Sequence, residues 1–358
     1  MRIGINWRQQ MAITEEKVLD ALRSVMDPDL NRDVVSLGFI KEIKIDGGKV
    51  SFKLELTTPA CPLKAQLKAA SEEAVKGISG VSVVDVDVTS RVTTHRVEEK
   101  GDILPGVKNI VAVSSGKGGV GKSTVSVNLA VALAKTGARV GLLDTDIYGP
   151  SIPIMMGVTD KPEIRGQKMV PIEKYGVHLM SIGFLIPEEQ AIIWRGPLVM
   201  KAVEQLLTDV EWGELDYLLI DLPPGTGDVQ LTLVQKVPLS GAVIVTTPQD
   251  VALLDVVRGI NMFKKVNVPI LGIVENMSFF QCPHCGERTD IFSHGGGAAA
   301  AEKQDVPFLG ELPIDPKIRA GGDSGTPIVV EDLKSPQSKI FMEIAGRLAA
   351  KISSLDKC

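Results

Sequence analysis

The sequence predicts an α/β protein, namely a mostly parallel, doubly wound sheet preceded by a small α+β domain. From Ile110 onward, apolar runs of strand length alternate with segments of helical length, as a parallel sheet covered by helices requires. The first ninety or so residues do not show this alternation of strands and helices. A segment of that length is long enough to fold as a small domain by itself. At 358 residues, the chain also exceeds the length that a single core usually supports. Two domains are therefore expected.

The composition fits a globular protein and gives no sign of a nucleic-acid partner. Hydrophobic residues make up 44% of the chain, which is ample for globular cores, and the formal net charge is −5. The overall charge therefore gives no argument for nucleic-acid binding. The first residues lack an apolar segment of signal-peptide length, and no run approaches the roughly 18 apolar residues of a membrane helix. We expect a cytoplasmic protein with no stable membrane association.

Residues 1–94 are expected to form the small α+β domain. Thr14 is a plausible N-cap before apolar residues at helical spacing, and Asp46-Gly47-Gly48 joins two β-type runs as a hairpin turn does. The expected elements are a helix (13–24), a hairpin of two strands (39–45 and 50–56), a helix within 57–78 and a strand within 81–89. Residues 95–108 mix charges with glycine and proline and lack periodicity, so we expect a linker there, followed by a second domain over 109–358.

Cys61 lies in the TTPACP stretch, just before the second expected helix. A thiol at the start of a helix has a lowered pKa, because the helix dipole favours the thiolate. Alternatively, Cys61 is a small hydrophobic residue buried in the core. The sequence leaves both possibilities open.

The stretch 111–124, VAVSSGKGGVGKST, is the strongest functional signal in the chain. It follows an apolar run (110–113), and a helix is expected to begin at Lys122. It contains the pattern GxxxxGK[ST], in which glycines allow backbone N–H groups to surround a polyphosphate at the positive end of a helix. The residues expected to bind the nucleotide here are Gly116, Lys117, Gly118, Gly119, Val120, Gly121, Lys122, Ser123 and Thr124. Lys122 should reach the β- and γ-phosphates, and the Ser123 hydroxyl should ligate Mg²⁺. The plain alternative is a glycine-rich turn with solvated lysines.

Carboxylates follow two further apolar strands, at the edge where a parallel sheet places its ligand site. Asp144 and Asp146 follow the run 140–143, and Asp221 follows the run 217–220. Asp221 fits the position that holds Mg²⁺ through water, whereas the first pair could also simply cap a turn. The remaining strands of this domain are expected at 177–182, 242–246, 270–274 and 308–309.

The chain has four cysteines, namely Cys61, Cys282, Cys285 and Cys358. They are too few and too scattered for a disulfide framework. The CPHCG loop places two thiols close enough for one metal centre, but zinc or a four-iron cluster needs four ligands. Two copies of the chain on a symmetry axis would supply four thiolates. The alternatives are a shared zinc ion with help from His284 or His294, a dithiol redox pair, or a reduced pair without function.

Residues 340–352 are expected to form an amphipathic helix near the end of the chain. Its polar face has no dense cluster of basic residues, and Phe341 is its one aromatic residue. We therefore expect this helix to dock on the sheet rather than on a membrane.

KGGVGKST resembles the deviant P-loop family, which includes MinD, ParA-type partition ATPases, the arsenite pump ATPase and the nitrogenase iron protein. The resemblance implies an ATPase that works as a homodimer, in which Lys117 reaches the partner's nucleotide. It also implies that Asp146 positions the attacking water while Asp144 supports the Mg²⁺ shell. Asn276, at the end of ILGIVENM, aligns with the residue that recognises adenine. The expected catalytic residues are Lys117, Lys122 and Asp146.

The motifs KGGVGKST, LLDTDIYGPSIP, DLPPGTGD, VENMSFF, CPHCG and ELPID occur in the order typical of the Mrp/ApbC family of iron–sulfur cluster carrier ATPases. DPDL, VSLGFI and TTPACP resemble the N-terminal iron–sulfur assembly domain of bacterial members. The resemblance implies a [4Fe–4S] cluster shared by Cys282 and Cys285 of two subunits. It implies an upstream cluster scaffold and apo-protein clients as partners, with Cys61 as a candidate for cluster transfer.

A function of another class remains possible from the sequence. A MinD/ParA-like switch would use ATP to drive dimerisation, and its CxxC would hold a structural zinc ion. Metal analysis of anaerobically purified protein distinguishes zinc from iron plus sulfide.

Overall fold

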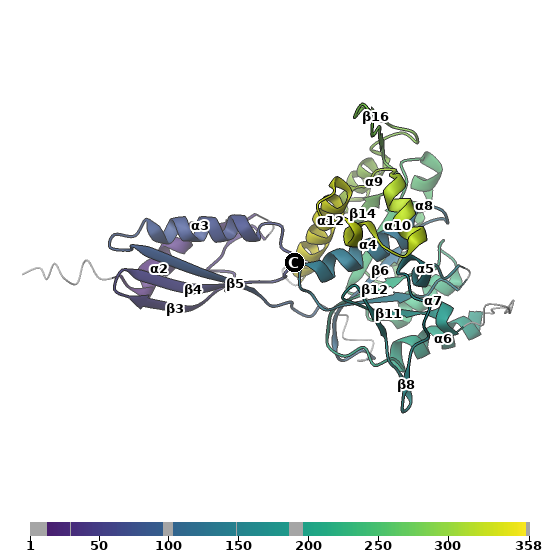
Figure 1. Cartoon of the computed structure of the whole chain (residues 1–358), viewed down its shortest axis with the longest axis horizontal. Coiled ribbons are helices and arrows are strands. Elements are labelled where there is room, and N and C mark those ends of the chain that lie inside the picture. The colour runs from purple at the N-terminus through teal and green to yellow at the C-terminus, as the bar shows by residue number, and fades with distance from the viewer. Residues whose placement is uncertain (1–12, 29, 96–102, 148, 186–195, 356–358) are drawn as a thin grey trace, which may run out of the picture. The chain divides into compact units, whose positions relative to one another are not determined.

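The computed structural model describes residues 13–28, 30–95, 103–147, 149–185 and 196–355. The chain divides into two compact units, of which the first extends to Thr93 and the second covers Thr94–Leu355 (Figure 1). Each unit has its own hydrophobic core. The two units are therefore described separately.

The first unit is a three-stranded sheet in the order β3-β4-β5, packed against two helices. Its elements are α2 (Glu15–Leu22), β1 (Met26–Asp27), β2 (Arg32–Asp33), β3 (Ile40–Asp46), β4 (Lys49–Leu56), α3 (Lys64–Lys76) and β5 (Val83–Ser90). The hydroxyl of Thr14 accepts a hydrogen bond from the backbone N–H of Lys17 at 3.3 Å, so the expected N-cap is confirmed. Strands β3 and β4 form the expected antiparallel hairpin, whereas β5 runs parallel to β4 because α3 crosses between them.

The second unit is built on an eight-stranded sheet in the order β10-β11-β7-β12-β6-β13-β14-β17. The parallel strands are β6 (Val107–Ser114), β7 (Val140–Asp144), β11 (Val177–Ser181), β12 (Leu215–Asp221), β13 (Gly241–Thr246), β14 (Ile270–Glu275) and β17 (Phe308–Glu311). Most of these residues are buried, as expected for a sheet covered on both faces. This arrangement confirms the predicted fold class and each of the seven expected strands.

Helices cover both faces of this sheet (Figure 1). The helical elements are α4 (Lys122–Lys135), α5 (Ile152–Met155), the 3₁₀ turn η2 (Ile182–Leu185), α6 (Gly196–Thr208), α7 (Asp228–Lys236), α8 (Asp250–Lys265), α9 (Gly296–Gln304), α10 (Pro316–Ser324), α11 (Ile328–Glu331) and α12 (Pro336–Ser353). One core joins α6, α7 and α8 to alternate strand residues such as Ile110 and Ala112. Helices α4 and α12 pack together, and both contact strands of the sheet.

Helix α12 docks on the sheet, as its sequence predicts. Phe341, Ile344, Leu348 and Ile352 are buried, and the helix contacts α4, β14 and β17. Within the described ranges, no helix is long and apolar enough to cross a membrane.

Several elements differ from the sequence-based expectation. Strand β6 begins at Val107, and His95 donates its backbone N–H to the Asn109 side chain at 3.1 Å, so parts of the segment 95–108 belong to the second unit. Residues 96–102 of this expected linker lie outside the described residues. Strand β10 (Ile172–Lys174) adds an unforeseen antiparallel edge. Short ladders also join β8 (Ile164–Arg165) to β9 (Lys168–Met169) and β15 (Phe280–Gln281) to β16 (Arg288–Thr289). Such two-residue strands carry too little hydrophobic periodicity to be recognised in a sequence.

Candidate functional site

The glycine-rich loop joins β6 to α4 at the carboxyl edge of the sheet. Gly121, the residue before α4, has φ +80°, and a Cβ there would lie 2.2 Å from Nδ2 of Asn276. A Cβ on Gly116 would lie 2.3 Å from Cβ of Asp255. Both positions therefore require glycine, and they hold the loop close to two other elements. The loop lines a cavity of about 260 Å³ at the N-terminus of α4, where a phosphate is favoured.

Asp221, the last residue of β12, gathers the polar side chains of this loop around a buried carboxylate. Its Oδ2 accepts hydrogen bonds from Nζ of Lys122 and Oγ of Ser123, both at 2.6 Å. Its Oδ1 accepts a hydrogen bond from Oγ of Ser126 at 2.5 Å. Asp221 is fully buried, so the Lys122 ammonium compensates a charge that would otherwise be costly.

Asp144 and Asp146 occupy different environments. Asp144 is fully buried and accepts hydrogen bonds from the backbone N–H of Asp146 at 3.1 Å and from Oγ of Ser181 at 2.9 Å. Burial, followed by the negative charge of Asp221, raises the pKa of Asp144 from 3.8 to about 7. Asp146 instead lines the cavity, with its Oδ2 4.0 Å from Nζ of Lys122. The structure therefore gives Asp146 access to a ligand, whereas Asp144 holds the loop that carries it.

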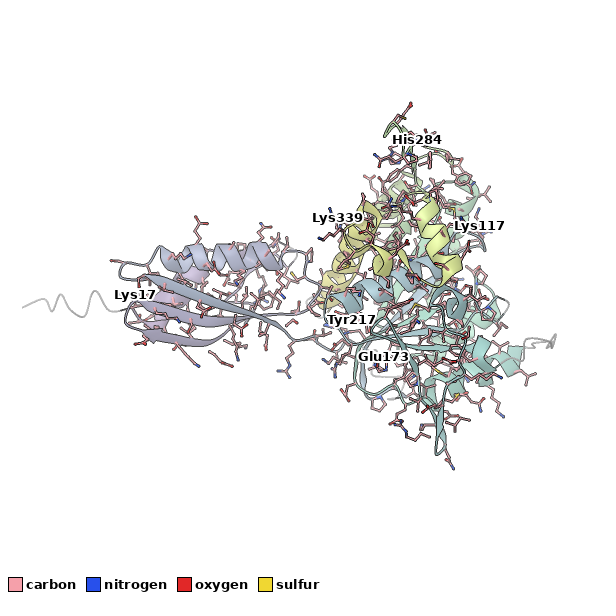
Figure 2. The ribbon with its side chains drawn as sticks, in the orientation of Figure 1. Lys17, Lys117, Glu173, Tyr217, His284 and Lys339 are labelled. Carbon is pink, nitrogen blue, oxygen red and sulfur yellow. The ribbon has the colours of Figure 1, made fainter. Side chains whose placement is uncertain are left out.

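Two side-chain contacts join the loop to β14 and to the start of α8. Nδ2 of Asn276, just after β14, donates to the backbone carbonyl of Val120 at 2.9 Å. The side chain of Lys117 contacts Oε1 of Gln249 at 3.4 Å, just before α8. Lys117, which is labelled in Figure 2, belongs to the glycine-rich loop. It is half-buried and lines the same cavity. The structure thus brings the expected residues of the glycine-rich loop, Asp146, Asp221 and Asn276 together at one sheet edge.

The two cysteines of CPHCG lie on an exposed hairpin formed by β15 and β16 (Figure 1). The backbone N–H of Cys282 donates to the carbonyl of Glu287 at 2.9 Å, and that of Gly286 donates to the carbonyl of Cys282 at 2.8 Å. Backbone N–H groups of Cys285, and then of His284, lower the pKa of the Cys282 thiol, and the Cys285 side chain adds to this effect. Cys282 is half-buried and Cys285 is exposed. The hairpin therefore favours a thiolate that can ligate a metal.

Two protein families match the chain. The family model described as the NUBPL iron-transfer P-loop NTPase matches residues 106–349, and that of an iron–sulfur cluster assembly protein matches residues 15–88. The chain belongs to the NUBPL iron-transfer P-loop NTPase family. This confirms the family resemblance that the motifs indicate. A relative from Synechocystis named iron–sulfur cluster carrier protein is 49% identical over 95% of this chain and 98% of its own. A relative of the same name from Deinococcus radiodurans is 48% identical over 94% of this chain and 95% of its own.

Solved structures of similar fold cover the P-loop unit of this family member. A nucleotide-binding protein from Archaeoglobus fulgidus in complex with ADP is 42% identical, with a TM-score of 0.59 over 68% of this chain and 96% of that one. The cell division ATPase MinD from Pyrococcus furiosus is 25% identical, with a TM-score of 0.53 over 67% of this chain and 97% of that one. Both likenesses agree with the observed sheet and its loop.

Other cysteine and histidine positions bear on the alternatives left open by the sequence. Cys61 lies three residues before α3, half-buried, and packs against the apolar core of the first unit. Helix α3 therefore begins after Cys61, and the expectation that the thiol lies at the start of this helix is not met. Among the described residues, His294 groups with Glu275 and Glu311 rather than with the cysteine pair. His284 is exposed beside the cysteines (Figure 2), and Cys358 lies outside the described residues.

Some polar residues near this site were not predicted from the sequence. Ser126 follows Ser123 by three positions, so helical spacing places both hydroxyls on one face, a signal that could have been recognised. Ser181 contacts Asp144 from β11, a pairing set by strand order that the sequence does not reveal. Glu275 is fully buried at the end of an apolar strand, where a lone carboxylate signals a specific partner.

Proposed function

We propose that the protein is an ATP-hydrolysing iron–sulfur cluster carrier. It binds a [4Fe–4S] cluster between two copies of the chain through Cys282 and Cys285, and transfers it to apo-proteins. The observation that carries this proposal is an exposed hairpin with two thiols, one of lowered pKa. Support also comes from relatives named iron–sulfur cluster carrier proteins, which match along 94–95% of the chain. Thiolates are the usual protein ligands of such clusters.

Hydrolysis relies on the groups around the glycine-rich loop. The Lys122 ammonium, now 2.6 Å from Asp221, turns towards the β- and γ-phosphates when ATP occupies the cavity. Asp146 faces the same cavity and orients the attacking water. Backbone N–H groups of the loop and the start of α4 stabilise the charge that develops on the phosphate oxygens. Asn276 holds the loop from the β14 side. By its alignment with the family's adenine-recognising asparagine, the same residue recognises the base.

The oxygen atoms of Ser123 and Asp221 suit Mg²⁺, which prefers hard oxygen ligands. Oγ of Ser123 and Oδ2 of Asp221 lie 2.6 Å apart, and the positively charged Lys122 ammonium lies 2.6 Å from the same Asp221 oxygen. Ser123 would hold the ion directly and Asp221 through water, while Asp144 keeps the adjoining loop in place. When bound, Mg²⁺ neutralises charge on the β- and γ-phosphates.

Dimerisation is supported by the surface beside the nucleotide cavity. Lys117 lines this cavity with Met155 of α5, and its Nζ lies 3.4 Å from Oε1 of Gln249, the residue before α8. Ile154 of α5 and Val251 and Leu254 of α8 are 65–66% exposed, and a second subunit at this face would cover them. Lys117 then reaches the nucleotide of the second subunit. Sedimentation of Lys117→Gln with a non-hydrolysable ATP analogue should show monomers, and a stable dimer would contradict this role.

The carrier cycle also requires partners in the cytoplasm. An upstream scaffold supplies the cluster and apo iron–sulfur proteins receive it, while Cys61 serves transfer or client contact rather than cluster binding. The exposed hairpin favours such hand-over, because Cys285 is open to an incoming thiolate. Unchanged delivery to an apo-protein by Cys61→Ser would argue against the role of Cys61.

Anaerobic reconstitution with iron and sulfide tests the proposal. The wild-type protein should bind about four irons per dimer and show visible charge-transfer absorption. Cys282→Ser and Cys285→Ser should each lose this absorption, whereas Cys61→Ser, in the other unit, serves as the matched cysteine control. Retention of the cluster by Cys282→Ser would rule out the hairpin as its site.

The likeness to MinD supports one competing function, which the experiment must distinguish from cluster transfer. In that case the hairpin holds a structural zinc ion and ATP drives a dimerisation switch. Protein purified without oxygen would then contain zinc and no acid-labile sulfide. Liposome sedimentation with ATP would show whether such a switch binds membranes.

A further inference from the structure

A series of polar contacts joins the glycine-rich loop to the CxxC hairpin. It begins where Asn276 donates to the carbonyl of Val120, inside the loop. The backbone N–H of Asn276 also donates to the carbonyl of Thr246 at 2.8 Å, so the residue is fixed from two sides. Any movement of the loop on nucleotide binding therefore reaches the end of β14, where Glu275 precedes Asn276.

Glu275 connects this strand end to the start of α9. Its fully buried carboxylate accepts a hydrogen bond from Oγ of Ser278 at 2.6 Å and from the backbone N–H groups of Gly295 and Gly297. A Cβ on Gly297 would lie 2.9 Å from Oε2 of Glu275, so glycine is needed for this close approach. The helix N-terminus and the hydroxyl together stabilise a charge that burial alone would disfavour.

Ser278 is shared between two carboxylates. Its Oγ lies 2.6 Å from Oε1 of Glu275 and 3.0 Å from Oε2 of Glu311, at the end of β17. A hydroxyl has one proton to donate, so a stronger bond to one carboxylate weakens the bond to the other. The present distances favour Glu275. Ser278 thus has two alternative acceptors for one proton, which is the kind of two-state element that energetic coupling between sites requires.

Arg288 carries the connection onto the hairpin. Its Nη1 donates to Oε1 of Glu311 at 3.3 Å, and its guanidinium lies 4.1 Å from the ring centre of Phe279. It also contacts Asp290 at 3.1 Å and Nδ1 of His294 at 2.6 Å. Arg288 lies on β16, three residues after Cys285, so its contact with Glu311 fastens the thiol-bearing hairpin to the sheet.

We propose that Ser278, Glu311 and Arg288 are positioning residues that couple the nucleotide state of the P-loop to the conformation of the CxxC hairpin. When the Ser278 proton turns to Glu311, less negative charge remains for Arg288, and the hairpin loosens. When it turns to Glu275, as here, Glu311 holds Arg288 more firmly. The inference extends the proposed function, because it supplies the route by which ATP acts on cluster binding.

Amide hydrogen exchange of the hairpin in metal-free protein tests this coupling. A non-hydrolysable ATP analogue with Mg²⁺ should change the exchange rates of residues 282–290 about fivefold. A fivefold change is near the lower end of typical allosteric coupling. We expect a small effect because the Arg288 and Glu311 side chains are 41% and 33% exposed, and solvent weakens such an ion pair. In Arg288→Gln the response should fall below about twofold, whereas Arg288→Lys, which keeps the charge, should retain part of it. The difference between nucleotide states is measured, so a uniformly weakened hairpin would not imitate the result.

Two further variants keep the test decisive. Arg319→Gln breaks the exposed contact with Asp323 on α10 and should respond as the wild type does. If Arg288→Gln exchanges at the maximal rate in both states, Ser278→Ala replaces it, because that change leaves Arg288 and Glu311 in contact. A full wild-type response in Ser278→Ala, or no response in the wild type, would overturn the proposal. Iron binding is measured separately, so its presence together with a failed exchange test would leave the carrier function standing.

Discussion

Replacing Asp221 with asparagine should destabilise the nucleotide-free P-loop unit by about 3–5 kcal/mol. Asp221 is fully buried, and Nζ of Lys122 lies 2.6 Å from its carboxylate. Two unit charges at that separation attract by about 6 kcal/mol at an effective dielectric constant of 20, and desolvation of both groups cancels part of this attraction. Asparagine keeps the shape but loses the charge. Lys122, which is 6% exposed, then loses its nearest counter-charge and keeps only the Asp146 carboxylate, 4.0 Å away.

A double-mutant cycle measures this pair directly. Asp221→Asn, Lys122→Met and the double variant are unfolded with urea and followed by fluorescence, to which the buried Trp212 of this unit contributes. The two effects should fall short of additivity by about 2 kcal/mol or more. Each single variant leaves one member of the pair without its nearest counter-charge, whereas the double variant removes both charges. The exposed pair Lys236–Glu204, 3.6 Å apart, is the control and should couple by less than about 1 kcal/mol. Additivity within about 0.5 kcal/mol at Lys122 and Asp221 would refute the reasoning.

Three further predictions concern the same unit. Gly121→Ala should lower the free energy of unfolding by about 1–3 kcal/mol, because a side chain at φ +80° is strained and its Cβ would meet Asn276. The control Gly118→Ala, with open space around its Cβ, should change the free energy of unfolding little. The raised pKa of Asp144 stabilises the nucleotide-free fold fully below pH 3.8, and this contribution is lost as pH rises to about 7. Urea unfolding at pH 5 and pH 7 should therefore show the wild type losing about 2 kcal/mol relative to Asp144→Asn, and parallel curves would exclude a proton on Asp144. Phe341→Ala should cost about 3–5 kcal/mol in the same assay because α12 buries this ring, whereas the exposed Lys339→Ala should leave unfolding within about 0.5 kcal/mol (Figure 2).

The sequence could predict the fold because its signals are local. Each parallel strand is an apolar run, which marks it in the sequence. A glycine-rich segment between a buried strand and a helix is typical of a phosphate-binding loop. The carboxylates were recognisable for the same reason, since they end such runs. Strand order was a different matter, because nothing in the run 177–182 indicates that β11 pairs with β7 or that Ser181 meets Asp144.

The division of labour between Asp144 and Asp146 also depends on three-dimensional packing. The two residues share a short segment, and their spacing alone assigns neither to the cavity. In the fold, the backbone N–H of Asp146 and the Ser181 hydroxyl occupy the oxygens of Asp144, so its carboxylate supports the loop. Cys61 shows a similar limit, because the starting point of α3 decides whether a helix dipole reaches its thiol, and helix ends are the least certain part of a sequence-based prediction.

Strand β14 gives a geometric reason for linking the nucleotide and the thiols. Asn276 touches the glycine-rich loop directly after this strand, and Cys282 follows six residues later along the same chain. Six residues span at most about 20 Å, so the two sites cannot move far apart whatever the hairpin does. Glu275 lies on the other side of Asn276 and holds α9, while Glu311 on the neighbouring strand β17 holds Arg288. A shift at the end of β14 is therefore shared between adjacent strand ends, and the exposed hairpin, which has few buried contacts, is the part that can respond.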